Sequence, residues 1–197
     1  MQKLELTWIG KGQEPAVEPR ILLHDPSRDY GDPNSENMLI HGDNLLALKA
    51  LEQQFAGKVK CIYIDPPYNT GAAFENYDDN LEHSIWLSLM RARLELLRKL
   101  LAPNGFIACH IDDSEGHYLK VLLDEVFGRS NYQTTLFIRV RYSDKTLKQD
   151  MNYHKEIEQI HIYRKEFGAV PNFDTEIVGF EKFRFFITDD GECETIT

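Results

Sequence analysis

Hydrophobic and polar positions follow two alternating patterns between residues 38 and 165. Short, nearly continuous apolar runs indicate strands, and they lie at residues 38–41, 59–64, 106–111, 134–140 and 158–163. Longer stretches with an apolar side chain every three or four residues indicate helices, and they lie between Asp43 and Gly57, between Ser84 and Pro103, and between Asp113 or Ser114 and Gly128. Strands that alternate with helices at this spacing predict an α/β fold with a largely parallel sheet. The run 59–64 is apolar almost throughout, so we expect a central strand covered on both faces.

The pattern divides the chain into three parts. Residues 1–37 contain four prolines and three glycines, which predict a mostly irregular arm. Residues 38–165 hold the helices and strands named above. The tail, residues 166–197, is weakly patterned, and we expect strands there only near residues 180–187.

The composition narrows the class of protein. The chain carries 22 basic and 32 acidic side chains, a net charge of −10, which argues against DNA binding unaided because DNA affinity depends on neutralised phosphates. Only residues 129–165 have a basic excess, with 8 basic and 4 acidic side chains. No apolar run reaches the ~20 residues of a membrane span, and the N-terminus lacks the apolar core of a secretory signal. Three widely spaced cysteines indicate reduced thiols, which are typical of the cytoplasm. We therefore expect a cytoplasmic protein without a membrane partner.

A candidate site follows the strand predicted at 59–64. The tetrapeptide Asp65-Pro66-Pro67-Tyr68, here called the DPPY motif, comes directly after that strand. Ligands of α/β sheets bind at the carboxyl ends of strands, so the position suits a site. Two successive prolines fix φ and offer no N–H, which stops the strand pairing and leaves backbone carbonyls stiffly held. A rigid turn would explain the prolines alone, but it gives no reason for the flanking Asp and Tyr.

These residue types suit a reaction at an exocyclic base amine. The amine of adenine or cytosine is a poor nucleophile because its lone pair is delocalised into the ring. The Asp65 carboxylate and the Pro66 carbonyl can accept hydrogen bonds from the two N–H groups and free that lone pair. The Asp65 charge can also stabilise the positive charge that develops on the amine. The Tyr68 ring offers a face on which an extruded base can stack.

The surrounding sequence resembles a known family. The segment LIHGDNLLALKALEQQFAGKVKCIYIDPPYNTG is similar to amino-methylating DNA methyltransferases, and more narrowly to the Mod (modification) subunits of type III restriction–modification systems. The segments LELTWIGKG, HSIWLSLMRARLELLRKLLAPNG and IDDSEGHYLKVLLDEVFG are similar to it as well, so the resemblance covers about residues 4–133. It implies methyl transfer from S-adenosylmethionine to DNA. An Asp at the first motif position is more usual in adenine-N6 than in cytosine-N4 methylation.

The resemblance also assigns roles to individual residues. Its catalytic residues fall on Asp65, Pro66, Pro67 and Tyr68, and its cofactor-binding residues on Asp43 and Asp65. Tyr68 and Asn69 would contact the nucleic acid. The implied partners are DNA and a restriction nuclease–helicase subunit.

One expected motif is missing from the sequence. The family holds its cofactor chiefly with an F-x-G-x-G loop between a strand and a helix, and the nearest match, Gly10-Lys11-Gly12, is followed by a proline-containing arm. We therefore expect a partial Rossmann-like methyltransferase sheet without the strands that carry this loop. Residues 38–165 would be the catalytic half of a truncated N-terminal piece, and residues 166–197 at most the start of a target-recognition region. A complementary half or a second Mod copy would have to complete the site.

Other polar residues have competing explanations. Asp43 can cap a helix and contact a cofactor at once. Asp112, Asp113 and Glu115 look like a metal cluster, but acidic residues at a helix start usually satisfy backbone N–H groups, so we expect no metal. Three histidines, His83, His110 and His117, are not spaced as ligands on one face, which favours ordinary packing or polar roles.

The basic residues after position 138 are the best candidate for a nucleic-acid contact. Tyr142 and Tyr153 are interleaved with them, a mixture typical of nucleic-acid surfaces, although a solvated basic loop would look the same. The residues concerned are Arg139, Arg141, Lys145 and Lys148.

Three functions remain open at this level. The first is the catalytic half of an adenine-N6 DNA methyltransferase that needs a second half or partner. The second is a non-catalytic remnant that acts as a binding or regulatory subunit of a restriction complex. The third is a catalytic fragment that acts on RNA or another base. The intact DPPY motif favours the first, because a remnant has no chemical reason to keep it.

Overall fold

The computed structural model describes residues 5–13, 16–68, 83–140, 157–166, 185–187 and 193–195. The elements are η1 (Pro26–Arg28), α1 (Asn44–Phe55), β1 (Val59–Ile64), α2 (His83–Leu100), β2 (Leu101–Ile111), α3 (Gly116–Leu123), η2 (Asp124–Gly128), η3 (Arg129–Asn131), β3 (Tyr132–Arg139), β4 (Ile157–Arg164), β5 (Phe185–Ile187) and β6 (Cys193–Thr195). Four of the five predicted strands and all three predicted helices are present. The tail strands β5 and β6 form a separate two-stranded ladder.

The main sheet has the strand order β1-β2-β4-β3. Strand β1 is parallel to β2, whereas β4 is antiparallel to both β2 and β3. The α/β class is therefore confirmed, but the expectation of a largely parallel sheet is wrong for this part of the chain. The strand at 157–164 returns between β2 and β3 rather than adding at an edge, and this reverses its direction relative to β2.

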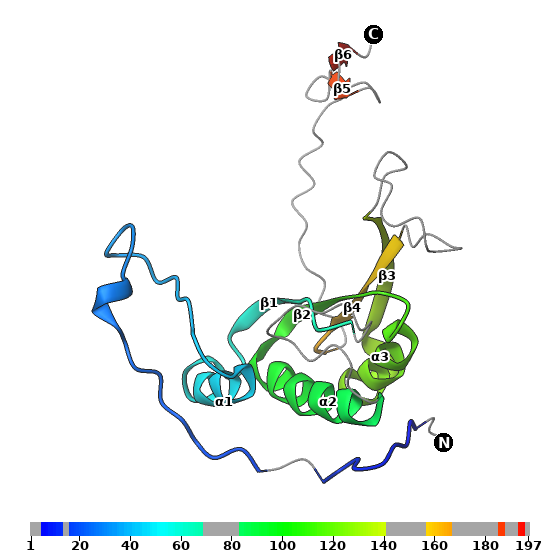
Figure 1. Cartoon of the computed structure of the whole chain (residues 1–197), viewed down its shortest axis with the longest axis horizontal. Coiled ribbons are helices and arrows are strands. Elements are labelled where there is room, and N and C mark those ends of the chain that lie inside the picture. Colours follow the sequence, from blue (N-terminus) through cyan, green and yellow to red (C-terminus); the bar gives the residue numbers. More distant parts are fainter. Residues whose placement is uncertain are drawn as a thin grey trace, which may run out of the picture.

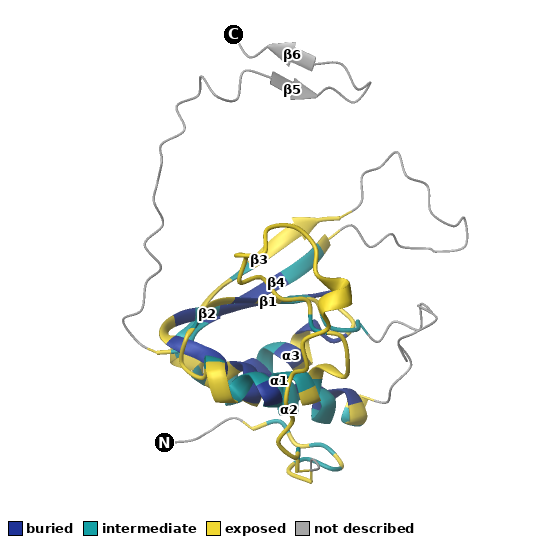
Figure 2. Ribbon diagram, turned by 90° about the vertical axis from the view of Figure 1, so that its left-hand side faces the viewer, coloured by how far each residue is buried: buried dark blue, intermediate teal, exposed yellow. Residues whose placement is uncertain are grey.

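Helices α1, α2 and α3 lie together on one side of the sheet (Figure 1). Side chains alternate along a strand, so Ile62, Ile107 and Cys109 point to the helices and join the buried core. Tyr63 and His110 point to the opposite side, here called the open face because no described helix covers it. Figure 2 shows the buried residues gathered on β2, α2 and α3, and exposed ones on β3 and the arm.

The core is built on α2, whose seven buried residues recur at helical spacing: Trp86, Leu87, Met90, Leu94, Leu96, Leu97 and Leu100. They pack against Leu119, Leu122, Leu123 and Phe127 of the following helical turns and against the inward side chains of the sheet. The predicted apolar stripes of these helices are thus confirmed as core. Cys109 is buried among them and Cys61 is exposed, and both are free thiols.

Strand β1 differs from its prediction. Within the described residues it is an edge strand, and Lys60, Cys61 and Tyr63 are exposed rather than covered. The apolar run indicated burial on two faces, but the described helices cover only one. This open edge agrees with the expected partial sheet that lacks strands beside residues 59–64.

The strand predicted at residues 38–41 is not formed. Leu39 is fully exposed and Met38 more than half exposed, and the described part of the sheet offers this segment no pairing. A four-residue apolar run makes no ladder hydrogen bonds without a neighbouring strand, so the prediction fails for lack of a partner.

The first helix begins as predicted. The Asp43 side chain accepts hydrogen bonds from the backbone N–H groups of Leu45 and Leu46, at 3.0 and 3.1 Å. Gly57, just beyond the helix, has φ of +71°, a conformation that favours glycine.

The other two predicted caps are wrong. Helix α2 begins at His83, so Ser84 lies inside its first turn. Helix α3 begins at Gly116, and Ser114 instead donates its backbone N–H to the Asp112 carboxylate at 2.8 Å. An Asx turn thus takes up the polar residues that the sequence suggested as caps.

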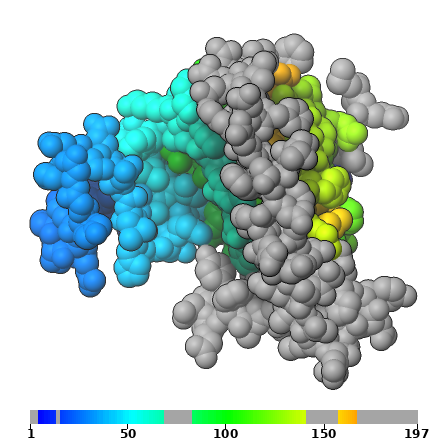
Figure 3. All heavy atoms as spheres, turned by 90° about the horizontal axis from the view of Figure 1, so that it is seen from above, coloured from blue at the N-terminus to red at the C-terminus, as the bar shows by residue number. Residues whose placement is uncertain are grey.

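The N-terminal arm contains no helix or strand in its described residues except the 3-10 turn η1, as predicted. Part of it nevertheless packs on the body. The Trp8 indole donates to Ser88 Oγ at 2.7 Å, and Lys11 Nζ lies 2.9 Å from Glu125. Seen from above, residues 16–43 extend to one side of α1 and β1 (Figure 3). None of the described helices has the length and apolarity that crossing a membrane requires.

Candidate functional site

The DPPY motif leaves β1 at the carboxyl end of the sheet. Asp65 is exposed, whereas Pro66, Pro67 and Tyr68 are half-buried. The strand ends because neither proline has an N–H to donate to a ladder. All four predicted catalytic residues therefore lie together at one edge, with the carboxylate accessible.

The motif is held from the helix side by Trp86. This residue is completely buried, and its indole N–H donates to the backbone carbonyl of Pro67 at 2.8 Å. Trp86 lies in the first turn of α2, so the helix and the strand end are joined through one side chain. Of the two proline carbonyls, that of Pro67 is engaged by the protein.

The motif is held from the open face by a polar network. The Tyr68 hydroxyl donates to Glu158 Oε2 at 3.2 Å, and His110 Nε2 lies 2.8 Å from the same oxygen. The Tyr63 hydroxyl lies 2.7 Å from His110 Nδ1. Burial is the largest cause that raises the pKa of Tyr68, followed by its hydrogen bond to Asp65 and the negative charges of Asp65 and Glu158. Tyr68 therefore stays a neutral hydroxyl.

This arrangement suits the chemistry predicted from the sequence. An exposed carboxylate, a carbonyl on a proline-stiffened turn and an aromatic ring are brought to one strand end. The ring has a fixed position because its hydroxyl is anchored and the preceding carbonyl is bound. The geometry can thus hold a planar amine-bearing ring beside Asp65.

Asp43 lies farther along the same side of the molecule. Arg93 Nε donates to Asn44 Oδ1 at 2.6 Å, and Lys99 Nζ lies 3.3 Å from Glu52, so α1 and α2 run in the same direction. Arg93 is seven residues beyond Trp86, which places the start of α1 about 10 Å along the helix axis from the DPPY motif. The Asp43 side chain is 54% exposed and lines a hollow of about 210 Å³ between the arm and α1.

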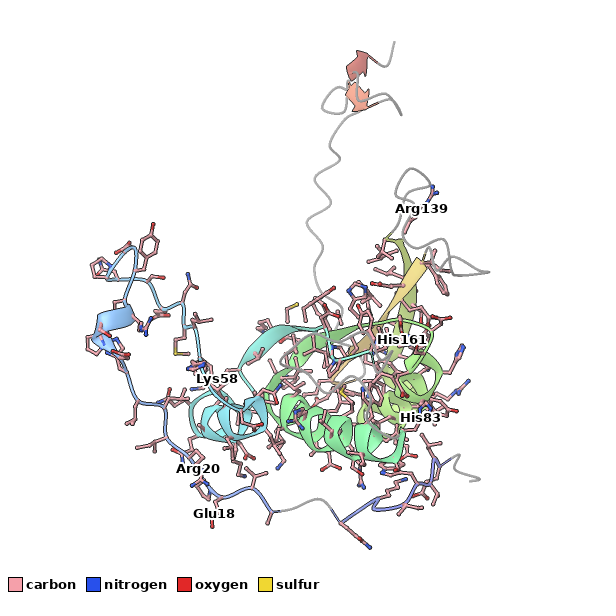
Figure 4. All side chains as sticks on the ribbon, viewed as in Figure 1. Glu18, Arg20, Lys58, His83, Arg139 and His161 are labelled. Carbon is pink, nitrogen blue, oxygen red and sulfur yellow. The ribbon has the colours of Figure 1, made fainter. Side chains whose placement is uncertain are left out.

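Several of the remaining acidic and histidine candidates have structural partners. Asp112 holds the turn before α3, and the buried Glu115 lies 2.7 Å from His83 Nδ1. His161 is buried between Thr135 Oγ1, at 2.9 Å, and the Gly116 carbonyl, at 3.2 Å, and burial lowers its pKa. Figure 4 shows His83 and His161 at their places near the helices. Within the described residues, no three acidic, histidine or cysteine side chains are grouped as metal ligands.

The predicted nucleic-acid residues are only partly placed. Arg139 ends β3, the strand farthest from β1 in the sheet, and Figure 4 shows it well away from the helices. Asn69, Arg141, Lys145 and Lys148 lie outside the described residues, as do the interleaved Tyr142 and Tyr153. Nothing in the described part brings Arg139 to the DPPY motif.

Three residues that hold the motif were not identified from the sequence. Trp86 was assigned to a core stripe, His110 to an ordinary polar role, and Glu158 only to a strand. Their contacts join segments 19 to 90 residues apart, and no local pattern reports such contacts. The one usable signal was a polar pair, His110 and Glu158, within otherwise apolar strand runs.

Comparisons with known proteins agree on one family. A family profile described as DNA methylase matches residues 59–181. The probable type III restriction-modification enzyme HindVI Mod subunit of Haemophilus influenzae is 48% identical over 107 residues, which cover 54% of this chain and 14% of that protein. The StyLTI Mod subunit of Salmonella typhimurium is 33% identical over 196 residues and covers 82% of this chain and 30% of that protein. The chain thus spans less than a third of the length of either relative.

Solved structures give a weaker likeness. The crystal structure of M1.HpyAVI in complex with S-adenosylmethionine matches 64% of this chain and 54% of that chain, with 18% sequence identity and a TM-score of 0.43.

Proposed function

Because the chain belongs to the DNA methylase family, we propose that its DPPY motif carries out methyl transfer from S-adenosylmethionine to the exocyclic amine of an extruded base. Adenine N6 is the preferred target over cytosine N4, since the motif begins with Asp and the type III Mod relatives share this region. One observation carries the proposal. An accessible carboxylate, Asp65, adjoins a ring, Tyr68, that is fixed from both sides of the sheet.

The reaction balances without a further co-reactant. The amine nitrogen forms a bond to the methyl carbon, the carbon–sulfur bond breaks, and its electron pair stays on sulfur. Asp65 and the Pro66 carbonyl orient the two N–H bonds, and Asp65 stabilises the cationic amine until it loses a proton to water. Tyr68 stacks on the base and keeps it in line.

The chain offers part of a cofactor site. Asp43 lies at the start of α1, 3.8 Å from Arg93 of α2, and Asp65 lies two residues before Pro67, whose carbonyl Trp86 of the same helix holds. We assign the cofactor-binding roles to these two carboxylates. The F-x-G-x-G loop is not in the sequence, so the chain would bind the cofactor weakly by itself.

The partner is a second part of a methylase that carries the glycine loop, either a complementary half or a second Mod copy. The open edge of β1 supports this, because exposed N–H and C=O groups on an edge strand are available for another strand.

DNA would be contacted by Tyr68 and Asn69 at the site and by Arg139, Arg141, Lys145 and Lys148 beyond it. A nuclease–helicase subunit is a further partner, and the cytoplasm is the place of action. Residues 1–37, 38–165 and 166–197 would serve as arm, catalytic half and tail.

Complementation tests this function. The chain is mixed with the part of the HindVI Mod subunit that follows its matched region; this mixture is here called the complemented complex. With unmethylated DNA of mixed sequence and labelled S-adenosylmethionine, we expect methylated DNA from the complex and none from either part alone. Nucleoside analysis should then give N6-methyladenine, and N4-methylcytosine would contradict the assigned target. Tight binding of the two parts without any methyl transfer would instead support a non-catalytic binding subunit.

A further inference from the structure

The polar network on the open face joins three strands to the DPPY motif. Tyr63 comes from β1, His110 from β2 and Glu158 from β4, and strand register puts all three side chains on the same face. The network ends at Tyr68, the only member within the motif. Both inner members are largely buried, with the His110 side chain 15% exposed and that of Glu158 19%.

Glu158 is the junction of this network. Its Oε2 atom accepts from the Tyr68 hydroxyl and lies 2.8 Å from His110 Nε2. His110 is itself oriented by the Tyr63 hydroxyl at 2.7 Å from Nδ1. Tyr63 and His110 thus flank the Glu158 carboxylate on one side, so Tyr68 meets an acceptor whose place is set by its neighbours.

The position of Glu158 makes a purely structural role a poor explanation. Asp65 is already a carboxylate next to Tyr68, and a second, largely buried carboxylate there adds like charge, which is unfavourable unless it is well hydrogen-bonded. A stable fold alone would be served better by an apolar side chain near the start of β4. The network therefore points to a requirement on the orientation of the Tyr68 ring.

We propose that Glu158, held by His110 and Tyr63, is a positioning residue that sets the Tyr68 ring against the base. This inference rests on the proposed function of the DPPY motif. Trp86 fixes the motif backbone from the helix side, and Glu158 fixes its last side chain from the open face. Glu158 acts through a hydrogen bond to Tyr68 and does not itself touch the base.

Two substitutions of Glu158 separate the geometry of its hydrogen bond to Tyr68 from the charge of its carboxylate. In Glu158→Gln the amide oxygen still accepts from Tyr68, and the side chain keeps its size and its place beside His110, while the charge is gone. Glu158→Ala removes the acceptor altogether. Tyr63→Phe removes only the outermost hydroxyl from a side chain that is 56% exposed, so it keeps the fold.

Fluorine NMR of the chain labelled with 3-fluorotyrosine measures the Tyr68 ring directly. The Tyr68 signal among the nine tyrosines is the one lost in Tyr68→Phe. We expect Glu158→Ala to shift it, Tyr63→Phe to shift it less, and Glu158→Gln to leave it close to its original position. Tyr132 and Tyr163, whose rings contact each other elsewhere, report that the fold is intact. Glu95→Ala on the outer side of α2 is the matched control and should shift nothing at Tyr68.

Methyl transfer by the complemented complex gives the second measurement. Glu158→Ala should lower kcat about tenfold with the KM for S-adenosylmethionine unchanged, equivalent to the loss of one hydrogen bond, and Glu158→Gln should stay within about threefold. An unmoved Tyr68 signal in Glu158→Ala, or a Glu158→Gln variant as impaired as Glu158→Ala, would overturn the proposal. If the unsubstituted complex transfers no methyl group, the proposed function fails, while the fluorine signal still decides whether Glu158 positions Tyr68.

Discussion

Replacement of Trp86 by Phe tests how much activity depends on the position of the DPPY motif, because it leaves the chemical groups of the motif unchanged. Trp86 holds the motif through its indole N–H, which donates to the Pro67 carbonyl at 2.8 Å. Phe keeps an aromatic ring in a fully buried place but removes the donor. The motif would then lose its anchor on the helix side, while Asp65 and Tyr68 remain chemically intact.

The expected cost in stability is about 2 kcal/mol. One net hydrogen bond accounts for about 1 kcal/mol, and the smaller ring in a closely packed site for about 1 kcal/mol more. This is below the 5–15 kcal/mol that typically stabilises a domain, so the variant should still fold. Activity should fall further, by about a hundredfold, because a displacement of about 1 Å in a catalytic group has that effect.

Urea denaturation measures the stability and methyl transfer by the complemented complex measures the activity. Trp8→Phe is the matched control, since the Trp8 indole also donates to a residue of α2, Ser88 Oγ, at 2.7 Å but lies on the arm. It should lose about 1 kcal/mol or less and keep its activity. Full activity in Trp86→Phe, or an equal loss of activity in Trp8→Phe, would contradict an anchoring role for the Trp86 indole.

Three further predictions concern other parts of the chain. Asp43→Ala should destabilise the chain by about 1 kcal/mol in urea denaturation, whereas Asp43→Asn, an equally good cap, should keep stability and weaken binding of S-adenosylmethionine in the complemented complex; unchanged binding would leave Asp43 a cap only. Burial lowers the pKa of His161 below 6.5, so the unfolded chain binds the proton first and stability should fall as the pH drops below 6.5. This slope should flatten in His161→Gln, and identical slopes would contradict the burial argument. Backbone amides of β1 should exchange hydrogen more slowly in the complemented complex than in the free chain, and unchanged exchange would place the partner elsewhere.

The sequence was sufficient to predict features that depend on residues close together in the chain. Helix α2 and the strands at 59–64 and 106–111 follow from periodicity because each buries its own apolar face. Asp43 could be recognised as a cap because a cap contacts residues two and three positions away. The DPPY motif was recognisable because its proline pair and its place after a strand are both local.

The sequence was insufficient for features that depend on contacts between segments far apart in the chain. Residues 38–41 have the composition of a strand, but a strand needs a neighbour, and periodicity cannot supply one. The direction of β4 and the open edge of β1 depend in the same way on which strands are adjacent. Trp86 and Glu158 were missed as parts of the site because their contacts with Pro67 and Tyr68 cross 19 and 90 residues.

The central claim is that Asp65 makes this chain the catalytic part of an amino-methyltransferase. The most direct test is methyl transfer to DNA by the complemented complex with Asp65→Ala. Asp65 is exposed, so the variant should fold and bind its partner as the unsubstituted chain does. Transfer should fall at least about a hundredfold, as for loss of a principal charge-stabilising group. A complex that methylates DNA equally well with Ala at position 65 would contradict a catalytic role for Asp65.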